Sequence, residues 1–281
     1  MSQHKSTVTF VMLTNGNEHA FKILSLLKDA GIQMDGIIYQ GTSSLSTYIN
    51  DTPQWFFIRF LKAVRRYWIS RLVSKRIARR LALYASVTKV KDLNSTSMIT
   101  AIGQSNADYL VLGGIGIINQ KVIDAARIGV LNAHPGLLPW LRGSGVVARA
   151  IERGIPIGAT THFVDSSVDT GMIIERRLLK LDGLFSLIDF EDAADRLIAE
   201  MMTDLIIKIR SDPNSLMPIK QNAKFLVCKR VLESEIQSIN SLIKAGEPWK
   251  KFAEWTELSE GPPHYRLKDN IKVVKSAYSI D

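Results

Sequence analysis

Residues 7–39, TVTFVMLTNGNEHAFKILSLLKDAGIQMDGIIY, decide the fold class of this chain. The first part, 7–13, is short, apolar and β-branched and is followed by an Asn-Gly pair, which is typical of a buried strand that ends in a turn. Residues 19–30 carry apolar side chains at helical spacing and are followed by a glycine, so a helix is predicted there. Residues 34–39 are predicted to form a second strand. A strand, a helix and a strand in this order are the building block of a parallel sheet.

The same alternation continues to about residue 180. Further strands are predicted at 87–92, 108–112, 130–133, 160–164 and 172–178, with helices at 97–104, 122–126 and 146–153. This pattern predicts an α/β fold with an open, doubly wound, mostly parallel sheet. Beyond it the pattern changes to a long amphipathic helix over 185–210, capped at Ser186, and a second helix over 233–244. We therefore predict a main domain at 1–185 and a smaller, helical accessory region at 186–281.

The composition is ordinary for a globular protein, with 281 residues of which 46% are hydrophobic and 22% are charged. The chain has one cysteine, Cys228, which cannot form an internal disulfide or a cysteine-based metal site. Residues 1–6 are polar and lack the apolar core of a signal peptide. No apolar run reaches the roughly 18 residues of a membrane span. These features predict a cytoplasmic protein.

The positive charge of the chain is concentrated in residues 51–80. Nine of the 36 basic residues and one of the 27 acidic residues fall there, so the segment carries +8 and the rest of the chain +1. The spacing of apolar residues predicts an amphipathic helix with Phe60, Val64, Trp68 and Leu72 packed inward and the arginines exposed. The simplest interpretation is a solvated helix. The alternatives are a segment that binds an anionic substrate or one that contacts an acidic membrane surface.

Two stretches contain candidate catalytic residues, and the first is NAHPGLLPWLRG, residues 132–143. An apolar strand ends at Asn132 and His134 and is stopped by a proline. Side chains two positions apart on an extended segment point to the same side, and the carboxyl ends of strands in an open α/β sheet face the ligand crevice. An amide and an imidazole in this arrangement can stabilise a developing oxyanion and move a proton.

The second stretch is GATTHFVDSSVDTG, residues 158–171, in which a strand leads into a polar loop with two carboxylates. Asp169 lies two residues before a glycine, so we expect it at a tight turn. A carboxylate there could orient and polarise His134 or relay a proton through water. We therefore expect the side chains of Asn132, His134 and Asp169 to converge on one site.

Three other features remain open or are excluded. His162 lies in the middle of a predicted strand, and an acid–base role and a buried supporting role are both possible for it. Asp165 is interpreted as a loop or pocket-lining residue rather than a catalyst. The glycines at 113, 114 and 116 do not have the spacing of the dinucleotide-binding fingerprint, which excludes NAD.

Together, the two stretches resemble the folate-dependent formyltransferases. This family includes methionyl-tRNA formyltransferase, glycinamide ribonucleotide transformylase, the formyl-tetrahydrofolate hydrolases and the sugar N-formyltransferases. The resemblance covers about residues 7–180. It implies a Rossmann-like formyltransferase catalytic domain at 1–185, catalytic roles for Asn132, His134 and Asp169, and 10-formyltetrahydrofolate as the formyl donor, without a metal ion.

The resemblance also implies a folate pocket and a supporting role for His162. The pocket would be formed by two loops, with backbone groups and aliphatic walls suited to a flat heterocycle. Its expected lining residues are Gly114, Ile115, Gly116, Ile117, Ile118, Val164 and Asp165.

The acceptor implied by the resemblance is a primary amine of a small molecule, in particular a phosphorylated or nucleotide-linked one. An amino-sugar nucleotide is favoured for two reasons. Glu18 would repel a phosphate where ribonucleotide transformylase has its phosphate loop. Residues 186–281 also show few of the alternating strands expected for the C-terminal barrel of the tRNA-acting relatives. A methionyl-tRNA formyltransferase-like enzyme remains an alternative. So does an inactive scaffold that binds RNA or membrane through residues 51–80. Nucleic acid is the less favoured partner.

Overall fold

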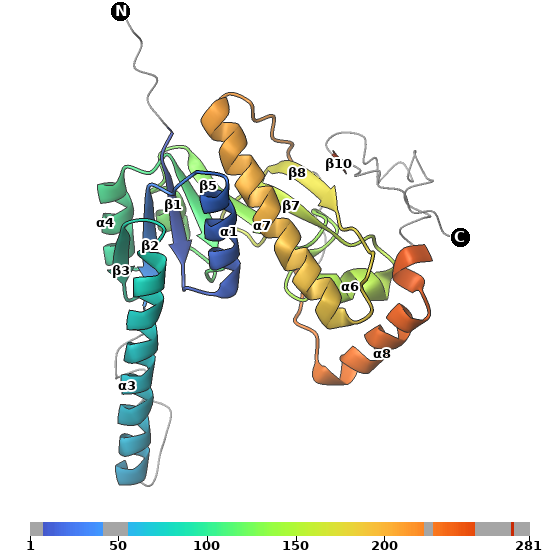
Figure 1. Ribbon diagram of the computed structural model, residues 1–281, viewed down its shortest axis with the longest axis horizontal. Helices are drawn as coiled ribbons and strands as arrows, with labels where there is room; N and C mark the ends of the chain where they lie inside the picture. Colours follow the sequence, from blue (N-terminus) through green and yellow to red (C-terminus); the bar gives the residue numbers. More distant parts are fainter. Residues whose placement is uncertain (1–7, 42–55, 222–226, 251–270, 273–281) are drawn as a thin grey trace, which may run out of the picture. The chain divides into compact units, whose positions relative to one another are not determined.

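The computed structural model describes residues 8–41, 56–221, 227–250 and 271–272 (Figure 1). The chain forms two compact units, residues 1–130 and 131–281. The boundary at 185/186 between a catalytic domain and an accessory region stays a prediction.

The N-terminal unit is built on a parallel sheet. Its strands are β1 (Phe10–Thr14), β2 (Gly36–Gln40), β3 (Val87–Val90) and β4 (Tyr109–Gly113), in the order β4-β1-β2-β3. The β1–β4, β1–β2 and β2–β3 pairs are all parallel. Every residue of β1 is buried, which explains why its sequence is a continuous apolar run rather than an alternating one.

Asn17 organises the turn between β1 and the first helix, α1 (Glu18–Asp29). Its side-chain oxygen accepts a hydrogen bond from the Ala20 N–H at 3.1 Å and caps the helix. Its side-chain nitrogen donates to the Gly114 carbonyl at 2.9 Å and so holds the loop that follows β4. The helices α4 (Thr96–Ser105) and α5 (Gln120–Ile123) are likewise capped by side chains, those of Ser95 and Asn119.

Helix α3 (Phe56–Leu81) corrects one expectation from the sequence. Trp68 and Leu72 do not pack inward, because 56% and 63% of their surface is exposed. Val64 is half-buried, and the side chain of Phe60 lies outside the described residues. Figure 1 shows the N-terminal half of α3 extending past the strands of this unit.

Among the described side chains, residues 74–81 of α3 provide its contacts with its unit. Ser74 and Leu81 are buried, and Ile77 packs so closely against Gly16 that a Cβ there would overlap it. The Ser74 hydroxyl oxygen accepts a hydrogen bond from Lys89 Nζ at 2.7 Å. A repeat of four residues turns a helix by about 40° more than a full turn. A stripe at 60, 64, 68 and 72 therefore rotates around the helix and cannot follow one flat contact.

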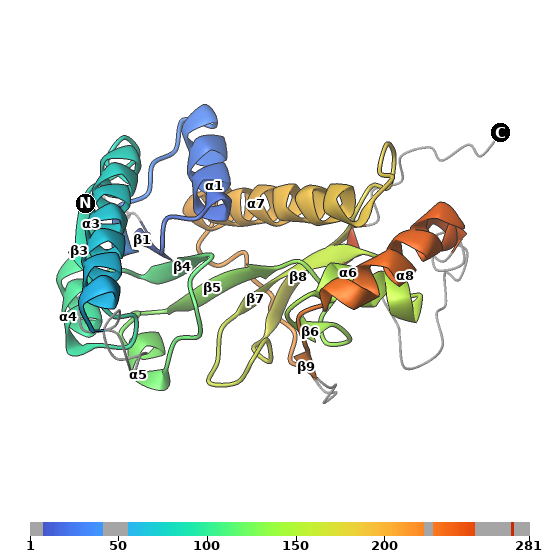
Figure 2. The same ribbon diagram turned by 90° about the horizontal axis from the view of Figure 1, so that it is seen from below.

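The C-terminal unit contains a mixed sheet. Its strands are β5 (Gly129–His134), β7 (Gly158–Phe163), β8 (Ile173–Leu178) and β10 (Ile271–Lys272), in the order β5-β7-β8-β10. The β5–β7 and β7–β8 pairs are antiparallel and β8–β10 is parallel (Figure 2). A second, two-stranded sheet pairs β6 (Arg142–Gly143) with β9 (Val227–Cys228).

Three helices complete this unit. They are α6 (Val146–Arg153), α7 (Leu187–Ser211) and α8 (Glu233–Lys244). Ser186 caps α7 as predicted, in a reciprocal capping box with Asp189, and the helix packs a long apolar face against β7. Arg149 of α6 donates two hydrogen bonds to the Glu235 carboxylate of α8, at 3.1 and 2.9 Å. None of the helices in the described part of the chain combines the length and apolar character needed to cross a membrane.

Candidate active site

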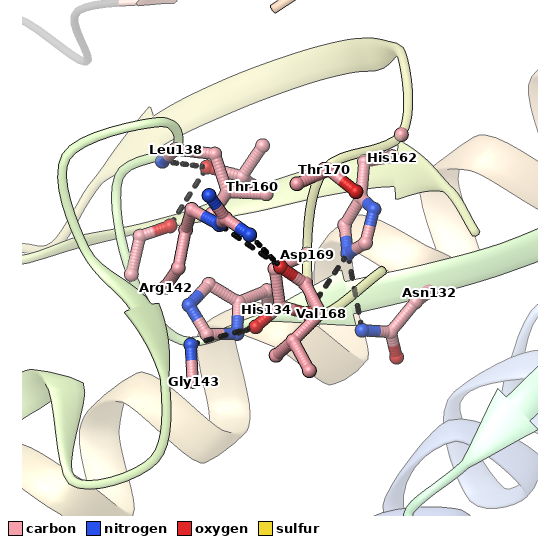
Figure 3. A network of polar contacts seen from close by, with 12 residues as sticks. Asn132, His134, Leu138, Arg142, Gly143, Thr160, His162, Val168, Asp169 and Thr170 are labelled. Atoms are coloured by element: carbon pink, nitrogen blue, oxygen red, sulfur yellow. Dashed lines mark hydrogen bonds and ion pairs between the residues drawn. The ribbon is translucent and has the colours of Figure 1, made fainter. Parts of the chain in front are cut away.

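Asn132 and His162 face each other across two neighbouring strands. They are register partners in the antiparallel β5–β7 pair, so their side chains lie on the same face of the sheet. Asn132 Nδ2 lies 3.1 Å from His162 Nε2 (Figure 3). Both residues lie inside the paired strands, so the polar pair is held by the ladder rather than by a loop.

The protonation of His162 fixes the orientation of Asn132. His162 Nδ1 lies 2.7 Å from the Phe163 carbonyl, which can only accept, so Nδ1 carries the proton. Burial lowers the pKa of His162 to about 4, so the ring is neutral near pH 7 and Nε2 is an acceptor. Asn132 must then donate one amide N–H to His162, and its second N–H stays available.

Asp169 lies between two imidazoles. Its Oδ2 accepts a hydrogen bond from the Gly143 N–H at 2.8 Å and lies 3.6 Å from His134 Nδ1. Its Oδ1 lies 3.7 Å from His162 Nε2. The backbone of Asp169 is left-handed, with φ +53°, which agrees with the tight turn predicted before Gly171.

His134 carries its proton on the opposite nitrogen from His162. The residue is buried, and its Nε2 lies 2.7 Å from the Leu141 carbonyl, to which it must donate. In the neutral ring Nδ1 is then an unprotonated nitrogen directed at the Asp169 carboxylate (Figure 3). If Nδ1 takes up a proton, the imidazolium that forms has a carboxylate beside it.

The side chains of Asn132, His134 and Asp169 therefore lie together, with His162 between the amide and the carboxylate. An amide donor, a proton acceptor and a charged carboxylate in this arrangement suit a reaction that develops an oxyanion and releases a proton.

Residues 66–183 match the formyl transferase family. The match includes all four residues of the site. A methionyl-tRNA formyltransferase from Rickettsia massiliae is 30% identical over 145 residues, which cover 51% of this chain and 47% of the relative. The chain thus spans about half the length of the curated relatives it matches.

Solved structures support the fold. A sugar N-formyltransferase from a Shewanella species superposes with a TM-score of 0.52 and 14% identity, covering 84% of this chain and 86% of the other. Glycinamide ribonucleotide transformylase 1 from Symbiobacterium toebii superposes with a TM-score of 0.52 and 17% identity, covering 77% and 96%. The doubly wound α/β fold is thereby confirmed. The family match and the curated relatives confirm the resemblance to formyltransferases.

The loop of the formyl transferase segment that carries Asp169 is held by residues that the sequence did not single out. Arg142 donates from Nε and Nη2 to the Val168 carbonyl at 2.9 and 2.7 Å. Gln221 donates from Nε2 to the carbonyls of Asp169 and Gly171 at 3.1 and 2.6 Å. Arg142 lies inside the first quoted stretch, residues 132–143, so its position could have marked it as a residue of the site. Gln221 lies about fifty residues downstream, and nothing in the local sequence marks it.

The apolar part of the first stretch serves packing. Leu137 and Leu138 are fully buried. The Leu138 N–H donates to the Thr160 hydroxyl oxygen at 3.0 Å, and that hydroxyl donates to the Gly136 carbonyl at 2.7 Å. Arg176 Nε donates to the Leu138 carbonyl at 2.6 Å and its guanidinium lies 5.3 Å from the Trp140 ring centre. These contacts fix the loop that follows His134.

The residues expected to bind folate lie in two loops, one in each unit. In the first, Gly114 has φ +66° and its carbonyl is held by Asn17, while Ile118 is buried and 77% of the surface of Ile117 is exposed. In the second, the Asp165 carboxylate accepts from the Thr170 hydroxyl and the Ser167 N–H, which makes it a turn-forming residue. The role of both loops in folate binding stays a prediction. Across the described residues, no group of three His, Cys, Asp or Glu side chains could hold a metal ion.

Proposed function

We propose that this chain is an N-formyltransferase that moves a formyl group from 10-formyltetrahydrofolate to a primary amine. Asn132, His134 and Asp169 are its proposed catalytic residues. The observation that supports this most strongly is the position of the Asp169 carboxylate, 3.6 Å from His134 Nδ1 and 3.7 Å from His162 Nε2, on a segment that matches the formyl transferase family.

The proposed reaction is a direct transfer. The neutral acceptor amine attacks the formyl carbon, whose carbonyl oxygen becomes an oxyanion. The Asn132 N–H that is not bonded to His162 donates to that oxyanion, which is a stabilisation realised mainly in the transition state. The amine loses one proton, the leaving nitrogen of the folate gains one, and the product is a formamide.

His134 and Asp169 handle that proton in the proposal. His134 Nδ1 accepts it from the attacking amine and returns it to the leaving nitrogen. The Asp169 carboxylate stabilises the transient imidazolium, and the Leu141 carbonyl keeps the ring oriented through Nε2. His162 is proposed to be a positioning residue, since its neutral ring orients the Asn132 amide.

Residues 114–118 and 164–165 are proposed to contact the folate donor. Ile117 presents an exposed aliphatic side chain next to Gly116, a type of surface that suits a flat heterocycle. Val164 and Asp165 begin the loop that leads to Asp169. The proposed folate contacts and the proposed catalytic carboxylate therefore belong to one short segment of the sequence.

For the acceptor we propose the amine of an amino-sugar nucleotide. Sugar N-formyltransferases share the fold, and the described C-terminal residues up to 250 are mainly the helices α7 and α8 rather than strands of a barrel. Methionyl-tRNA is the second candidate acceptor, because the curated relative of 30% identity is named a methionyl-tRNA formyltransferase.

The test is turnover of 10-formyltetrahydrofolate to tetrahydrofolate with separate acceptors: amino-sugar nucleotides, glycinamide ribonucleotide and methionyl-tRNA. We expect formylation of one acceptor, seen as the added mass of a formyl group. Asn132→Ala or His134→Ala should slow it by about 100-fold or more. The matched control is Asn214→Ala, which changes an exposed asparagine of the same unit. A folded protein that formylates none of them, with donor turnover unchanged by Asn132→Ala, would favour the inactive scaffold.

A further inference from the structure

The middle of α3, from Trp68 to Val73, presents large apolar side chains to solvent. The exposed fractions are 56% for Trp68, 48% for Ile69, 63% for Leu72 and 51% for Val73. Trp68 and Leu72 are four residues apart on the helix, as are Ile69 and Val73, so the four side chains form one continuous patch. A patch of this kind on a surface helix marks a contact with another apolar phase or molecule.

Positive charge surrounds this patch. Arg71, Lys75, Arg76 and Arg79 are exposed, and the Arg71 guanidinium lies 5.9 Å from the centre of the Trp68 ring. The sequence has no acidic residue between Asp51 and Asp92. We call these eight residues, from Trp68 to Arg79, the basic apolar face.

The basic apolar face is separate from the side of α3 that holds the helix to its own unit. Ser74, Ile77 and Leu81 make the inward contacts, and at 100° per residue their mean direction is about 150° from that of the apolar patch. Arg80 also serves the fold, since it pairs with Glu18 at 3.3 Å and lies 3.8 Å over the Phe21 ring. The helix is thus fixed on one side and presents the other.

We propose that the basic apolar face binds the surface of an anionic lipid bilayer, with α3 lying along the headgroup region. The charge complements acidic headgroups, and the aliphatic side chains gain an apolar environment just below them. Trp68 is of the residue type enriched at that depth. A nucleic acid would satisfy the cations but would offer no aliphatic environment to Ile69, Leu72 and Val73, so it is the less favoured occupant.

The structure sets the expected size of the effect. A cation near an acidic bilayer contributes about fivefold to partitioning, so changing Arg71, Lys75, Arg76 and Arg79 together to Gln should weaken binding by at least about 100-fold. Leu72 and Val73 still expose more than half of their surface, so burying each in lipid gains about fivefold. Leu72→Gln with Val73→Gln should therefore weaken binding by about 20-fold.

The experiment is sedimentation of the full chain with vesicles of phosphatidylcholine alone or of phosphatidylcholine and phosphatidylglycerol in equal parts. We expect binding only to the mixed vesicles, reduced by salt at about 1 M because the Debye length shrinks to about 3 Å. Both sets of Gln variants should lose binding while circular dichroism shows an unchanged fold. This proposal does not rest on the proposed enzymatic function, and formyl transfer is assayed separately.

Two matched controls separate a specific face from general charge or hydrophobicity. Lys121, Lys180, Lys208 and Lys244 are exposed, and changing all four to Gln gives the same change in net charge. Met217 is 82% exposed, and Met217→Gln removes an apolar side chain that is more accessible than Leu72 or Val73. Both controls should bind like the wild type. The proposal is overturned if the folded wild type does not sediment with the mixed vesicles, or if the control variants lose as much vesicle binding as the α3 variants. It is also overturned if an RNA oligonucleotide binds more tightly and is insensitive to Leu72→Gln with Val73→Gln, which would identify a nucleic-acid site.

Discussion

Lowering the pH from 7 to 5 should destabilise the fold through His162. The residue is 1% exposed, and burial lowers the pKa of its ring from 6.5 to about 4. In the unfolded chain the ring is solvated and regains a pKa near 6.5. Below pH 6.5 the unfolded state therefore binds a proton at this ring that the folded state does not bind. The free energy of unfolding falls as the pH drops toward 4. Above pH 6.5 both states are neutral at this residue and the contribution is constant.

The size follows from the two pKa values. The folded state loses about 2 kcal/mol of unfolding free energy by pH 5, and about 3 kcal/mol once the pH is below 4. Other carboxylates titrate in part of this range, so the relevant quantity is the difference between the wild type and His162→Gln. The variant is less stable at pH 7 because it loses the imidazole contacts to Asn132 and Phe163.

The assay is urea unfolding of both proteins at pH 7, 6 and 5, followed by circular dichroism. The wild type should lose about 2 kcal/mol more than the variant between pH 7 and pH 5. Equal losses would refute the account of a buried, neutral His162, and with it the argument that this ring orients the Asn132 amide.

The remaining predictions concern the loop that carries Asp169 and Gly171. Asp169→Asn should be about as stable as the wild type, whereas Asp169→Ala should lose about 1 kcal/mol more of the unfolding free energy. The reason is that asparagine tolerates a left-handed backbone and retains an acceptor for the Gly143 N–H. Equal unfolding midpoints for the two variants would contradict the turn geometry. Gly171→Ala should lower stability by at least about 2 kcal/mol, since a Cβ there would overlap the Phe163 carbonyl, while the control Gly103→Ala, in open space on α4, should gain about 0.5–1 kcal/mol. A thermal melt of both glycine variants checks this pair, and a tolerated Gly171→Ala would show that the loop is looser than described.

Sequence periodicity was sufficient for the elements and for the main polar pair. The buried strand β1 is apolar along its whole length because both of its faces are covered, which is a pattern that a parallel sheet requires. Asn132 and His134 point to the same side because they lie two apart on β5. The cap at Ser186 followed from its residue type and position.

Strand direction and tertiary contacts were not readable in the same way. The antiparallel pairing of β7 with β5 and β8 depends on how the chain returns to the sheet, and alternation of apolar residues does not encode it. Arg142 and Gln221 hold the Asp169 loop through main-chain carbonyls, which carry no side-chain signature. The inward packing expected for Trp68 and Leu72 was wrong because the contact surface of α3 lies at Ser74, Ile77 and Leu81 instead.

The most direct test of the central claim is a calorimetric titration of the purified chain with 5-formyltetrahydrofolate, a stable relative of the proposed donor. The account predicts saturable binding of one molecule per chain. This result does not depend on which amine is the acceptor. A chain shown to be folded that gives no binding heat with millimolar ligand would contradict the assignment of a folate-dependent formyl transfer.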